Sequence, residues 1–452
     1  MRRSIDFGPR GRLWMRWRTF VVSKSEKHVK AEPSGRQPAG RVDAEEAAGA
    51  SREAPGIGRG VTLVGVVGTI DRGGGAEKAY WNISSGLRDQ LGFDLVQVSQ
   101  LQPSEPLADD RESHVLRPVG KRGFLGLQQV FALRRVLRRV KRPAIVLPFQ
   151  LNTNILTTVA NALLPAELRL AVVVNDRANI RTKTTPTLER GLGWAIRVFL
   201  VRLMAAWSYR RARMIVCNSQ ANAEQVRAFV GVPNSKVVAI PNPLDVREIQ
   251  HRFPARDRSS LADPSAPVIA GHGRLFYGKG WETLIQALAL VHREFPGARL
   301  RILGRGVQLP ELEAVAEAAG VRGHCDFEGF TPDPFPALES ADVYVLASRS
   351  EGMPNSLLEA IALGLPCVST DCPTGPAEIL GRDETIGRLV PVDGTNEMAA
   401  AILELLNNGE TRNSLGQAAR RRAEDFRLQA CLDAYAEVLA DCIPGASEGL
   451  GG

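Results

Sequence analysis

The sequence predicts an α/β protein built from two doubly wound domains. Its 452 residues are more than one ordinary core accommodates. From residue 61 onward, short runs of β-branched and other apolar residues alternate with helical patterns. Such nearly continuous apolar runs are typical of strands buried on both faces of a parallel sheet. The alternation occurs twice, before and after the stiff Pro241-Asn242-Pro243 segment, which predicts two domains of similar size facing each other across a ligand-binding crevice.

The expected strands form two series separated by helical patterns such as 281–295 and 309–320. The first series comprises 61–67, 93–99, 144–149, 168–174, 214–219 and 237–242. The second comprises 268–273, 300–304, 325–330, 343–348, 366–370 and 388–392. We therefore divide the chain into a flexible basic leader (1–58), a first domain (59–241), a second domain (242–427), and a last helix with a tail (428–452).

The composition, 44% hydrophobic and 23% charged, is typical of a folded protein with a sizeable core. The net charge is +8, and residues 1–60 carry +6 of it, with 13 basic and 7 acidic side chains, leaving +2 for the rest. The nearly neutral body argues against general nucleic-acid binding. No apolar run is long enough to span a membrane, and the Arg-rich start lacks the apolar region of a secretory signal. Six cysteines without a C-x-x-C pair indicate a reducing, cytoplasmic location and no metal site.

Three basic segments bear on membrane contact. In the leader, arginines alternate with Trp14, Trp17 and Phe20, which is consistent with an interfacial anchor, although a disordered tail is the simpler interpretation. Residues 124–141 and 194–213 are each either a basic amphipathic helix or an ordinary surface helix with solvated arginines. Taken together, the three segments favour peripheral attachment to an anionic membrane, on its cytoplasmic face.

Two glutamates, Glu351 and Glu359, lie in the segment SRSEGMPNSLLEA at 348–360, which follows an apolar strand and opens a helix. Glu351 falls in the strand-to-helix loop and Glu359 on the helix just beyond its start. The free N–H groups of a helix N-terminus favour an anionic ligand. Two carboxylates accept hydrogen bonds from the hydroxyl groups of a sugar or a ribose. The alternative is a capped helix with Glu359 on a solvated face.

Glycine-rich turns end the first two strands of the second domain. Gly273 and Arg274 end one strand, and Lys279 opens the helix that follows. An Arg and a Lys on such a turn can converge on a diphosphate, the Arg with two parallel hydrogen bonds and the Lys as a point charge. The next strand ends in Gly304-Arg305-Gly306, where glycine allows close approach of the backbone to a ligand. One glycine pair is weak evidence, but two at successive strand ends predict a phosphate site.

The motifs GRLFYGKG, LRILGRG and SRSEGMPNSLLEAIALGLPCVSTDCPTGPAEIL, in this order and spacing, resemble the family 4 retaining glycosyltransferases of the GT-B fold. The resemblance covers residues 61–440 and implies two Rossmann-like domains. It also implies that Arg274 and Lys279 bind the donor diphosphate, that Glu351 contacts the donor sugar, and that Glu359 contacts the nucleotide ribose. The implied donor site further includes Gly273, Gly304, Gly306, Gly352, Met353, Asn355 and Ser356.

The part of the motif at 367–380 resembles a branch that extends polyprenyl-diphosphate-linked or surface-polysaccharide glycans, often with an N-acetylhexosamine donor. In the first domain the resemblance assigns the glycine loop 73–75 to the acceptor side, although a plain strand-to-helix turn uses glycine equally. The family's first-domain His near the donor sugar has no recognisable counterpart, since His114 is the only His there. Near its expected position the sequence offers Gln150 and Asn152 instead. The acceptor-side candidates are Gly74, Gly75, Asn154, Asp176 and Arg177.

The resemblance implies a transferase that moves a hexosyl or N-acetylhexosaminyl group from a nucleotide sugar, most simply a UDP-sugar, to a glycan or lipid-linked acceptor with retention. Arg274, Lys279 and a helix dipole would stabilise the departing diphosphate, and no acidic pair suggests a metal or other cofactor. Glu351 would orient the sugar and not act as a covalent nucleophile. Two alternatives stay open: a sugar-nucleotide epimerase that uses the same donor pocket, and a catalytically silent nucleotide-sugar binder or scaffold.

Overall fold

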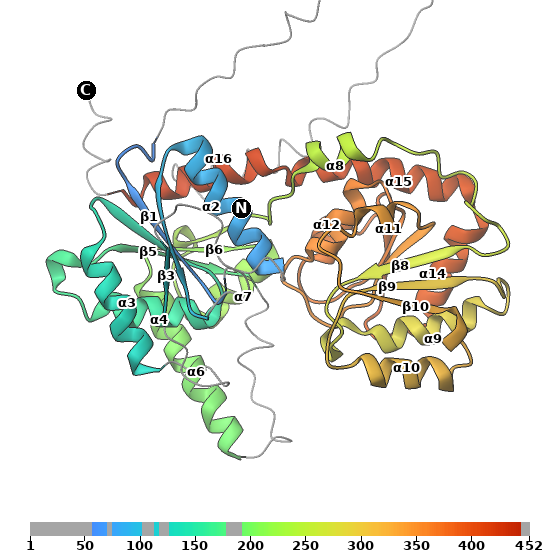
Figure 1. Cartoon of the computed structure of the whole chain (residues 1–452), viewed down its shortest axis with the longest axis horizontal. Helices are drawn as coiled ribbons and strands as arrows, with labels where there is room; N and C mark the ends of the chain where they lie inside the picture. Colours follow the sequence, from blue (N-terminus) through green and yellow to red (C-terminus); the bar gives the residue numbers. More distant parts are fainter. Residues whose placement is uncertain (1–56, 70–74, 102–112, 117–125, 178–191, 444–452) are drawn as a thin grey trace, which may run out of the picture. The chain divides into compact units, whose positions relative to one another are not determined.

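The computed structural model describes residues 57–69, 75–101, 113–116, 126–177 and 192–443. All of them belong to one compact unit, Pro55–Gly452. The predicted leader, except for its last two residues, lies outside the described residues, as do Gly74 and the end of the predicted tail. Within the compact unit, the strands form two separate parallel sheets (Figure 1). The prediction of two doubly wound α/β sheets is therefore confirmed.

The first sheet has seven strands in the order β3-β2-β1-β4-β5-β6-β7, all parallel. This order reverses between β1 and β4, as in Rossmann-like sheets. The strands are β1 (Thr62–Val67), β2 (Asp94–Ser99), β3 (Ser113–Val115), β4 (Ala144–Pro148), β5 (Ala171–Asp176), β6 (Met214–Cys217) and β7 (Val237–Ala239). The helices of this part are α2 (Gly75–Leu91), α3 (Leu127–Arg139), α4 (Leu151–Ala162), α6 (Leu192–Arg211) and α7 (Gln220–Val230).

The strands of the first sheet are buried on both faces because their alternate side chains enter two different cores. Val64 and Val66 of β1 join the core that α3, α4, α6 and α7 cover. Leu63 and Val67 join the core on the other face, which α2 and the last helix cover. This double burial explains why β1 has an almost continuous apolar sequence instead of an alternating one.

The second sheet has six parallel strands in the order β10-β9-β8-β11-β12-β13, with the reversal between β8 and β11. Its two faces also pack into separate apolar cores. The strands are β8 (Val268–His272), β9 (Arg299–Leu303), β10 (Cys325–Gly329), β11 (Val343–Leu346), β12 (Cys367–Thr370) and β13 (Gly387–Val390). The helices are α8 (Val246–Arg252), α9 (Trp281–Val291), α10 (Leu309–Ala318), α11 (Phe335–Glu339), α12 (Asn355–Ala362), α13 (Pro376–Leu380), α14 (Thr395–Asn407) and α15 (Gly409–Ala423).

The last helix, α16 (Leu428–Ala440), returns to the first sheet and packs beside α2 (Figure 1). Leu432, Tyr435 and Leu439 of this helix enter the core that α2 covers. The chain thus passes between the sheets twice. The two connections are hydrogen-bonded to each other, since Leu244 donates to the carbonyl of Phe426 at 2.9 Å and accepts from the backbone of Leu428 at 3.0 Å. The predicted boundaries at 241–242 and 427–428 stay a prediction, and both fall in these connections.

Two details of the first sheet differ from the predicted strands. The strand expected at 168–174 is observed at Ala171–Asp176, because Ala166–Leu168 forms a 3₁₀ turn and delays its start. Asn175 and Asp176 therefore lie inside the strand and are buried. The sequence pattern also missed β3, a three-residue strand at the sheet edge that is too short to show a period. Among the described residues, no helix is long and apolar enough to cross a membrane.

Candidate active site

The reversal point of the second sheet brings Lys279 and Glu351 together. β8 and β11 are neighbours there, and the segments that follow their carboxyl ends carry these two residues. Gly280 has a φ of 62°, and a Cβ at this position would lie 2.1 Å from the Ala347 carbonyl oxygen, so only glycine fits. This close packing leaves the Lys279 Nζ atom 2.5 Å from Glu351 Oε1. Ser348 Oγ donates to the same carboxylate at 2.6 Å.

The loop from Glu351 to Asn355 is held from both of its sides and leads into α12. The N-cap residue of α12 is Pro354, which provides no side-chain hydrogen bond to the helix start. The first backbone N–H groups of α12 therefore keep the capacity to bind an anion. Thr374 donates its hydroxyl to the Glu351 carbonyl oxygen. Asn242, in the connection between the sheets, donates to the carbonyl of Met353 at 3.1 Å. The predicted site residues Gly352, Met353 and Ser356 are buried in this loop and helix start.

Asn355 links the loop to the first sheet's helices. Its Nδ2 donates to the carbonyl of Gly75 at 2.9 Å, and its Oδ1 accepts from Asn242 at 2.6 Å. Gly75 is the first residue of α2, so the predicted acceptor-side glycine and the predicted donor-side asparagine are in direct contact. The structure therefore brings the start of α2 to the start of α12.

Glu359 is buried on α12, with a side chain 6% exposed, and does not lie on a solvated face. Its Oε2 lies 2.6 Å from His272 Nε2, and its Oε1 lies 3.1 Å from the Nζ of Lys78, which is on α2. Burial alone would raise the pKa of Glu359, but the hydrogen bond and charge of His272, followed by those of Lys78, lower the pKa to about 2. The carboxylate is thus held ionised, as an acceptor for hydroxyl groups requires.

The predicted glycine turns pack against each other without room for side chains. A Cβ at Gly304 would lie 1.8 Å from the Gly273 carbonyl oxygen, and one at Gly306 would lie 2.0 Å from the Leu275 carbonyl oxygen. Arg274, between them, is exposed, and its guanidinium lies 5.1 Å from the centre of the Phe276 ring. It makes no ion pair with the part of the chain that the structure describes. Arg274, which is exposed, and Lys279, which is paired with Glu351, therefore both lie in the turn that follows β8.

The predicted acceptor-side residues of β5 lie in a buried hydrogen-bond network. Asp176 accepts from the Tyr209 hydroxyl at 2.5 Å and from the Asn222 amide at 3.3 Å. Arg177 is 8% exposed, and it donates to the side chain of Asn242 at 2.8 Å and to the hydroxyl of Tyr435. Both carboxylate oxygens of Asp176 have protein partners, whereas the buried Nε atom of Arg177 has none among the described residues. An acceptor-side role for either residue stays a prediction.

The predicted Asn154, on α4, belongs to the same network, since its amide donates to the Asn175 carbonyl at 2.9 Å and to the Tyr209 hydroxyl at 3.1 Å. Its side chain is fully buried. Burial, followed by the charge of Asp176, raises the pKa of Tyr209 well above its ordinary value. Tyr209 therefore stays neutral, and its hydroxyl donates a hydrogen bond to Asp176. This hydrogen bond links α6 to β5.

Gln150, one of the residues offered in place of the family's His, has a strained backbone with φ 79° and ψ 153°. Few residues other than glycine adopt these angles, and such strain is found where the surroundings hold it, often at functional sites. Its amide donates to Glu77 Oε1 at 2.7 Å. Glu77 is on the first turn of α2, between Gly75 and Lys78, which contact Asn355 and Glu359. Gln150 is therefore linked to the donor-side residues through a single helix turn.

Sequence reasoning missed two residues of this site, Lys78 and His272. Both had a local signal, because Lys78 follows the glycine loop by three positions and His272 directly precedes Gly273. What the local pattern could not show is that both contact Glu359, since Lys78 is 281 positions away from it. Within the described ranges, no three His, Cys, Asp or Glu side chains are placed to hold a metal ion. That catalysis uses side-chain cations and no cofactor stays a prediction.

Two protein-family models match the chain, one over each of its sheets. The model for Glycosyltransferase Family 4 matches residues 73–248, and the model for Glycosyl transferases group 1 matches residues 253–422. The second match contains the whole set Arg274, Lys279, Glu351 and Glu359. The chain therefore belongs to the glycosyltransferases that these models describe, as the resemblance implied.

Characterised relatives lead to the same family. A lipopolysaccharide core biosynthesis glycosyltransferase of Rhizobium meliloti is 32% identical over 234 residues, covering 51% of this chain and 65% of that protein. The N-acetylgalactosamine-N,N'-diacetylbacillosaminyl-diphospho-undecaprenol 4-alpha-N-acetylgalactosaminyltransferase of Campylobacter jejuni is 29% identical over 253 residues, covering 55% of this chain and 66% of that protein. The match thus spans slightly less than two thirds of the length of either relative.

The fold is shared with solved structures that include a lipopolysaccharide outer core galactosyltransferase and a glycosyltransferase of Rickettsia africae, with TM-scores of 0.60 and 0.64. The Anabaena protein HepE in complex with UDP superimposes with a TM-score of 0.65 at 18% sequence identity, over 84% of this chain and 100% of that one. At this identity the similarity concerns the fold alone. The predicted GT-B fold is confirmed.

Proposed function

We propose that this protein is a retaining glycosyltransferase that moves a hexosyl or N-acetylhexosaminyl group from a UDP-sugar to a glycan or polyprenyl-diphosphate-linked acceptor in the synthesis of surface polysaccharides or glycoconjugates. The observation that carries the proposal is the Lys279–Glu351 pair beside the uncapped start of α12, with the ionised Glu359 on the same helix. Cations, free N–H groups and two carboxylates are the chemistry that a sugar linked to a nucleoside diphosphate requires.

Departure of the nucleoside diphosphate is the costly step, because negative charge develops on the leaving phosphate. Lys279 has three donors and can keep its contact with Glu351 while donating to a phosphate oxygen. The exposed Arg274 can add two parallel hydrogen bonds, and the start of α12 adds backbone donors. These groups would stabilise the developing charge where water is excluded, without a metal ion.

Glu351 and Glu359 would orient the two ends of the donor. Glu351 is held by Lys279 and Ser348, so it presents its second oxygen to sugar hydroxyl groups. Glu359 would accept from the ribose hydroxyl groups after exchanging one of its present partners, Lys78 or His272. Retention would follow from attack on the face that the diphosphate leaves, with the donor phosphate taking the acceptor's proton. Glu351 then positions the sugar and forms no covalent bond with it.

The donor and acceptor classes rest on the relatives. The Campylobacter relative is named for an acceptor carried on diphospho-undecaprenol, the Rhizobium relative for lipopolysaccharide core synthesis, and the Anabaena structure holds UDP. A lipid-linked acceptor would bring the reaction to a membrane surface, with the protein in peripheral contact. All six cysteines are free and buried, which is consistent with the reducing cytoplasmic side of that membrane.

The deciding experiment compares the wild type with Glu351→Gln on a panel of UDP-, GDP- and ADP-sugars, with and without short polyprenyl-diphosphate-linked glycans. We expect the wild type to give an α-linked product from one donor, and the variant to lose at least about a hundredfold in turnover because an oriented charged hydrogen bond is lost. Glu397→Gln, on the first turn of α14, is the matched control and should keep its turnover.

Each other outcome favours an alternative. Interconversion of the nucleotide sugar without any acceptor would identify an epimerase. Donor binding without turnover on the whole panel would identify a silent binder. Undiminished transfer by Glu351→Gln, with the fold intact by circular dichroism, would remove Glu351 from the mechanism.

A further inference from the structure

Helix α6 carries two apolar stripes, and the described part of the chain covers only one of them. Val201, Ala205 and Tyr209 are buried in the first sheet's core. Val198, which is also buried, lies on the same face of the helix. A second set has the same kind of spacing but is exposed. It consists of Ile196, Phe199, Leu200, Leu203 and Trp207, which are 51%, 55%, 52%, 52% and 36% exposed. A helix of a globular protein normally presents charged or polar residues on its outer face, so this exposed stripe requires a partner.

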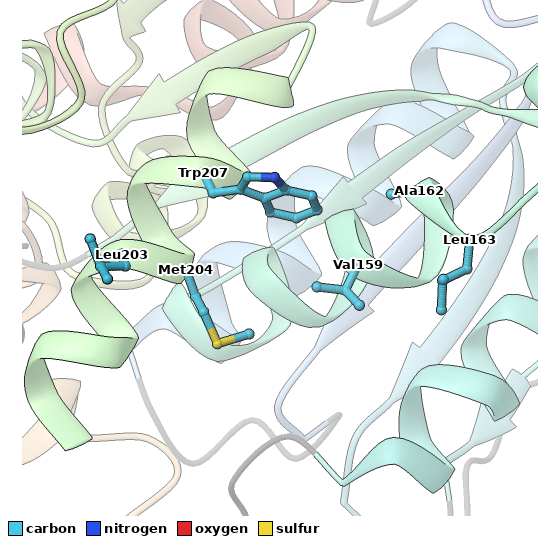
Figure 2. A pocket seen from close by; sticks show the side chains of 6 residues that line it. All are labelled: Val159, Ala162, Leu163, Leu203, Met204 and Trp207. Atoms are coloured by element: carbon cyan, nitrogen blue, oxygen red, sulfur yellow. The ribbon is translucent and has the colours of Figure 1, made fainter. Parts of the chain in front are cut away.

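A hollow between α4 and α6 extends the exposed stripe. It has a volume of about 480 Å³, and every one of its lining residues is apolar: Val159, Ala162, Leu163, Leu203, Met204 and Trp207 (Figure 2). In Figure 2 the indole of Trp207 extends from α6 toward α4. Leu163, at the end of α4, is 47% exposed. The apolar area thus covers two neighbouring helices and has a depression large enough for part of a hydrocarbon chain.

The charged residues of α3 and α6 are all arginines, and α4, which lies between them, has no charged residue. The fourth helix on this face of the first sheet, α7, contains Glu224. Arg134 donates to the Leu163 carbonyl at the edge of the hollow, and Arg211 lies 4.8 Å from the centre of the Trp207 ring. Neither contact neutralises an arginine charge. The arginines are Arg134, Arg135, Arg138 and Arg139 on α3, and Arg197, Arg202, Arg210 and Arg211 on α6.

We propose that this basic apolar surface, formed by the exposed stripe of α6, the hollow beside α4 and the arginines of α3 and α6, docks the protein on an anionic lipid bilayer. A bilayer fits both halves of the surface, since apolar side chains enter the acyl region while arginines and the indole of Trp207 lie at the level of the headgroups. The helix lies in the plane of the interface, with one stripe in lipid and the other in the protein core. The docking assigns a surface to the membrane contact in the proposed function, and it requires neither donor nor acceptor, so it can fail or hold independently of the reaction.

The test measures binding of the full chain to sedimenting vesicles of equimolar phosphatidylglycerol and phosphatidylcholine, and to vesicles of phosphatidylcholine alone. We expect binding to the anionic vesicles that weakens as salt rises. Phe199→Asp with Leu203→Asp should lower the partition coefficient at least about tenfold, because two apolar side chains no longer enter the bilayer. Arg138→Ala with Arg139→Ala should lower it about fivefold per charge, and only on anionic vesicles.

Val307→Asp, a change at a residue that is 91% exposed in the second half of the chain, is the matched control and should bind as the wild type does. The basic residues 1–56 are present in every variant, so their contribution cancels. A second readout does not depend on charged variants: Trp207→Phe should remove part of the fluorescence change that vesicles cause. The proposal is overturned if the wild type does not bind anionic vesicles, or if the Phe199/Leu203 variant binds equally well. It is also overturned if this surface instead forms a dimer that the same variant dissociates, with no vesicle binding by either protein.

Discussion

Both sheets place charged residues at the carboxyl ends of their strands, but among the described residues the predicted donor-site set after β8 and β11 includes an exposed arginine, whereas the set at the end of β5 is buried. At the end of β8 and β11, Arg274 is exposed and Lys279 and Glu351 are half-buried. At the end of β5, Asp176 and Arg177 are buried and bonded to neighbours. Both sets combine a carboxylate with a guanidinium at the carboxyl end of a parallel strand, although β5 lies one strand away from the reversal point of its sheet.

The difference comes from what packs against each strand end. α16 returns from the end of the chain to the first sheet, and its Tyr435 contacts both Arg177 and Asn175. Within the part of the chain that the structure describes, no comparable helix covers Arg274, which is exposed and lies 5.1 Å from the centre of the Phe276 ring. Long-range packing therefore decides whether a charged residue at a strand end is available to a ligand or is buried in a structural hydrogen-bond network. The local sequence around the residue does not reveal which of the two applies.

The largest expected contrast is between two arginines. Arg177→Ala should lower the free energy of unfolding by about 3 to 4 kcal/mol, because Asn175, Asn242 and Tyr435 each lose one of their buried hydrogen-bond partners. Arg274→Ala should change it by less than about 0.5 kcal/mol, yet abolish the rise in melting temperature that a UDP-sugar causes in the wild type. Urea unfolding and thermal shift with UDP-, GDP- and ADP-sugars measure the two effects. Equal stability losses in the two variants would contradict the comparison.

The next contrast concerns Glu359, which is a buried charge within the candidate site. Its pKa of about 2 in the folded protein lies below the ordinary value of 4.5, so its ionisation stabilises the fold above pH 4.5. This contribution, about 2 to 3 kcal/mol, is lost as the pH falls from about 4.5 toward 2. Glu359→Gln should therefore be less stable than the wild type at pH 7, and the gap should close in acid. Denaturant unfolding at a series of pH values measures the difference in free energy of unfolding between the wild type and Glu359→Gln. A difference that does not change with pH would contradict the lowered pKa of Glu359.

The smallest effect is expected for Lys78, the first-sheet partner of Glu359. Its side chain is 38% exposed, so the ion pair with Glu359 is partly screened by solvent. Lys78→Met should lower the free energy of unfolding by less than about 1 kcal/mol. His272→Gln is the variant to compare with it. The His272–Glu359 contact, at 2.6 Å, is more buried than the Lys78 contact and should contribute more to the free energy of unfolding. A larger loss for Lys78→Met than for His272→Gln would reverse the ranking of the two contacts.

Much of the fold was predictable because strands buried on both faces have an apolar sequence that does not depend on distant partners. β1, β2, β8 and β9 lie within one residue of their predicted bounds for this reason. β3 was not predictable, since three residues at an edge carry no period. β5 was displaced by a 3₁₀ turn, and the displacement placed Asn175 and Asp176 inside the sheet.

The two-sheet architecture, the family and the donor-side motifs could be read from the sequence alone, because each depends on residues close together in the chain. Gly273, Lys279 and Glu351 belong to short strand-to-helix segments whose form local chemistry dictates. Which other residues lie beside them became clear from the three-dimensional arrangement. Lys78 reaches Glu359 across 281 positions, Tyr435 covers Arg177 across 258, and the outer stripe of α6 is left exposed while the inner one is buried. These pairings depend on the free energy of packing whole helices against sheets, which no local pattern encodes.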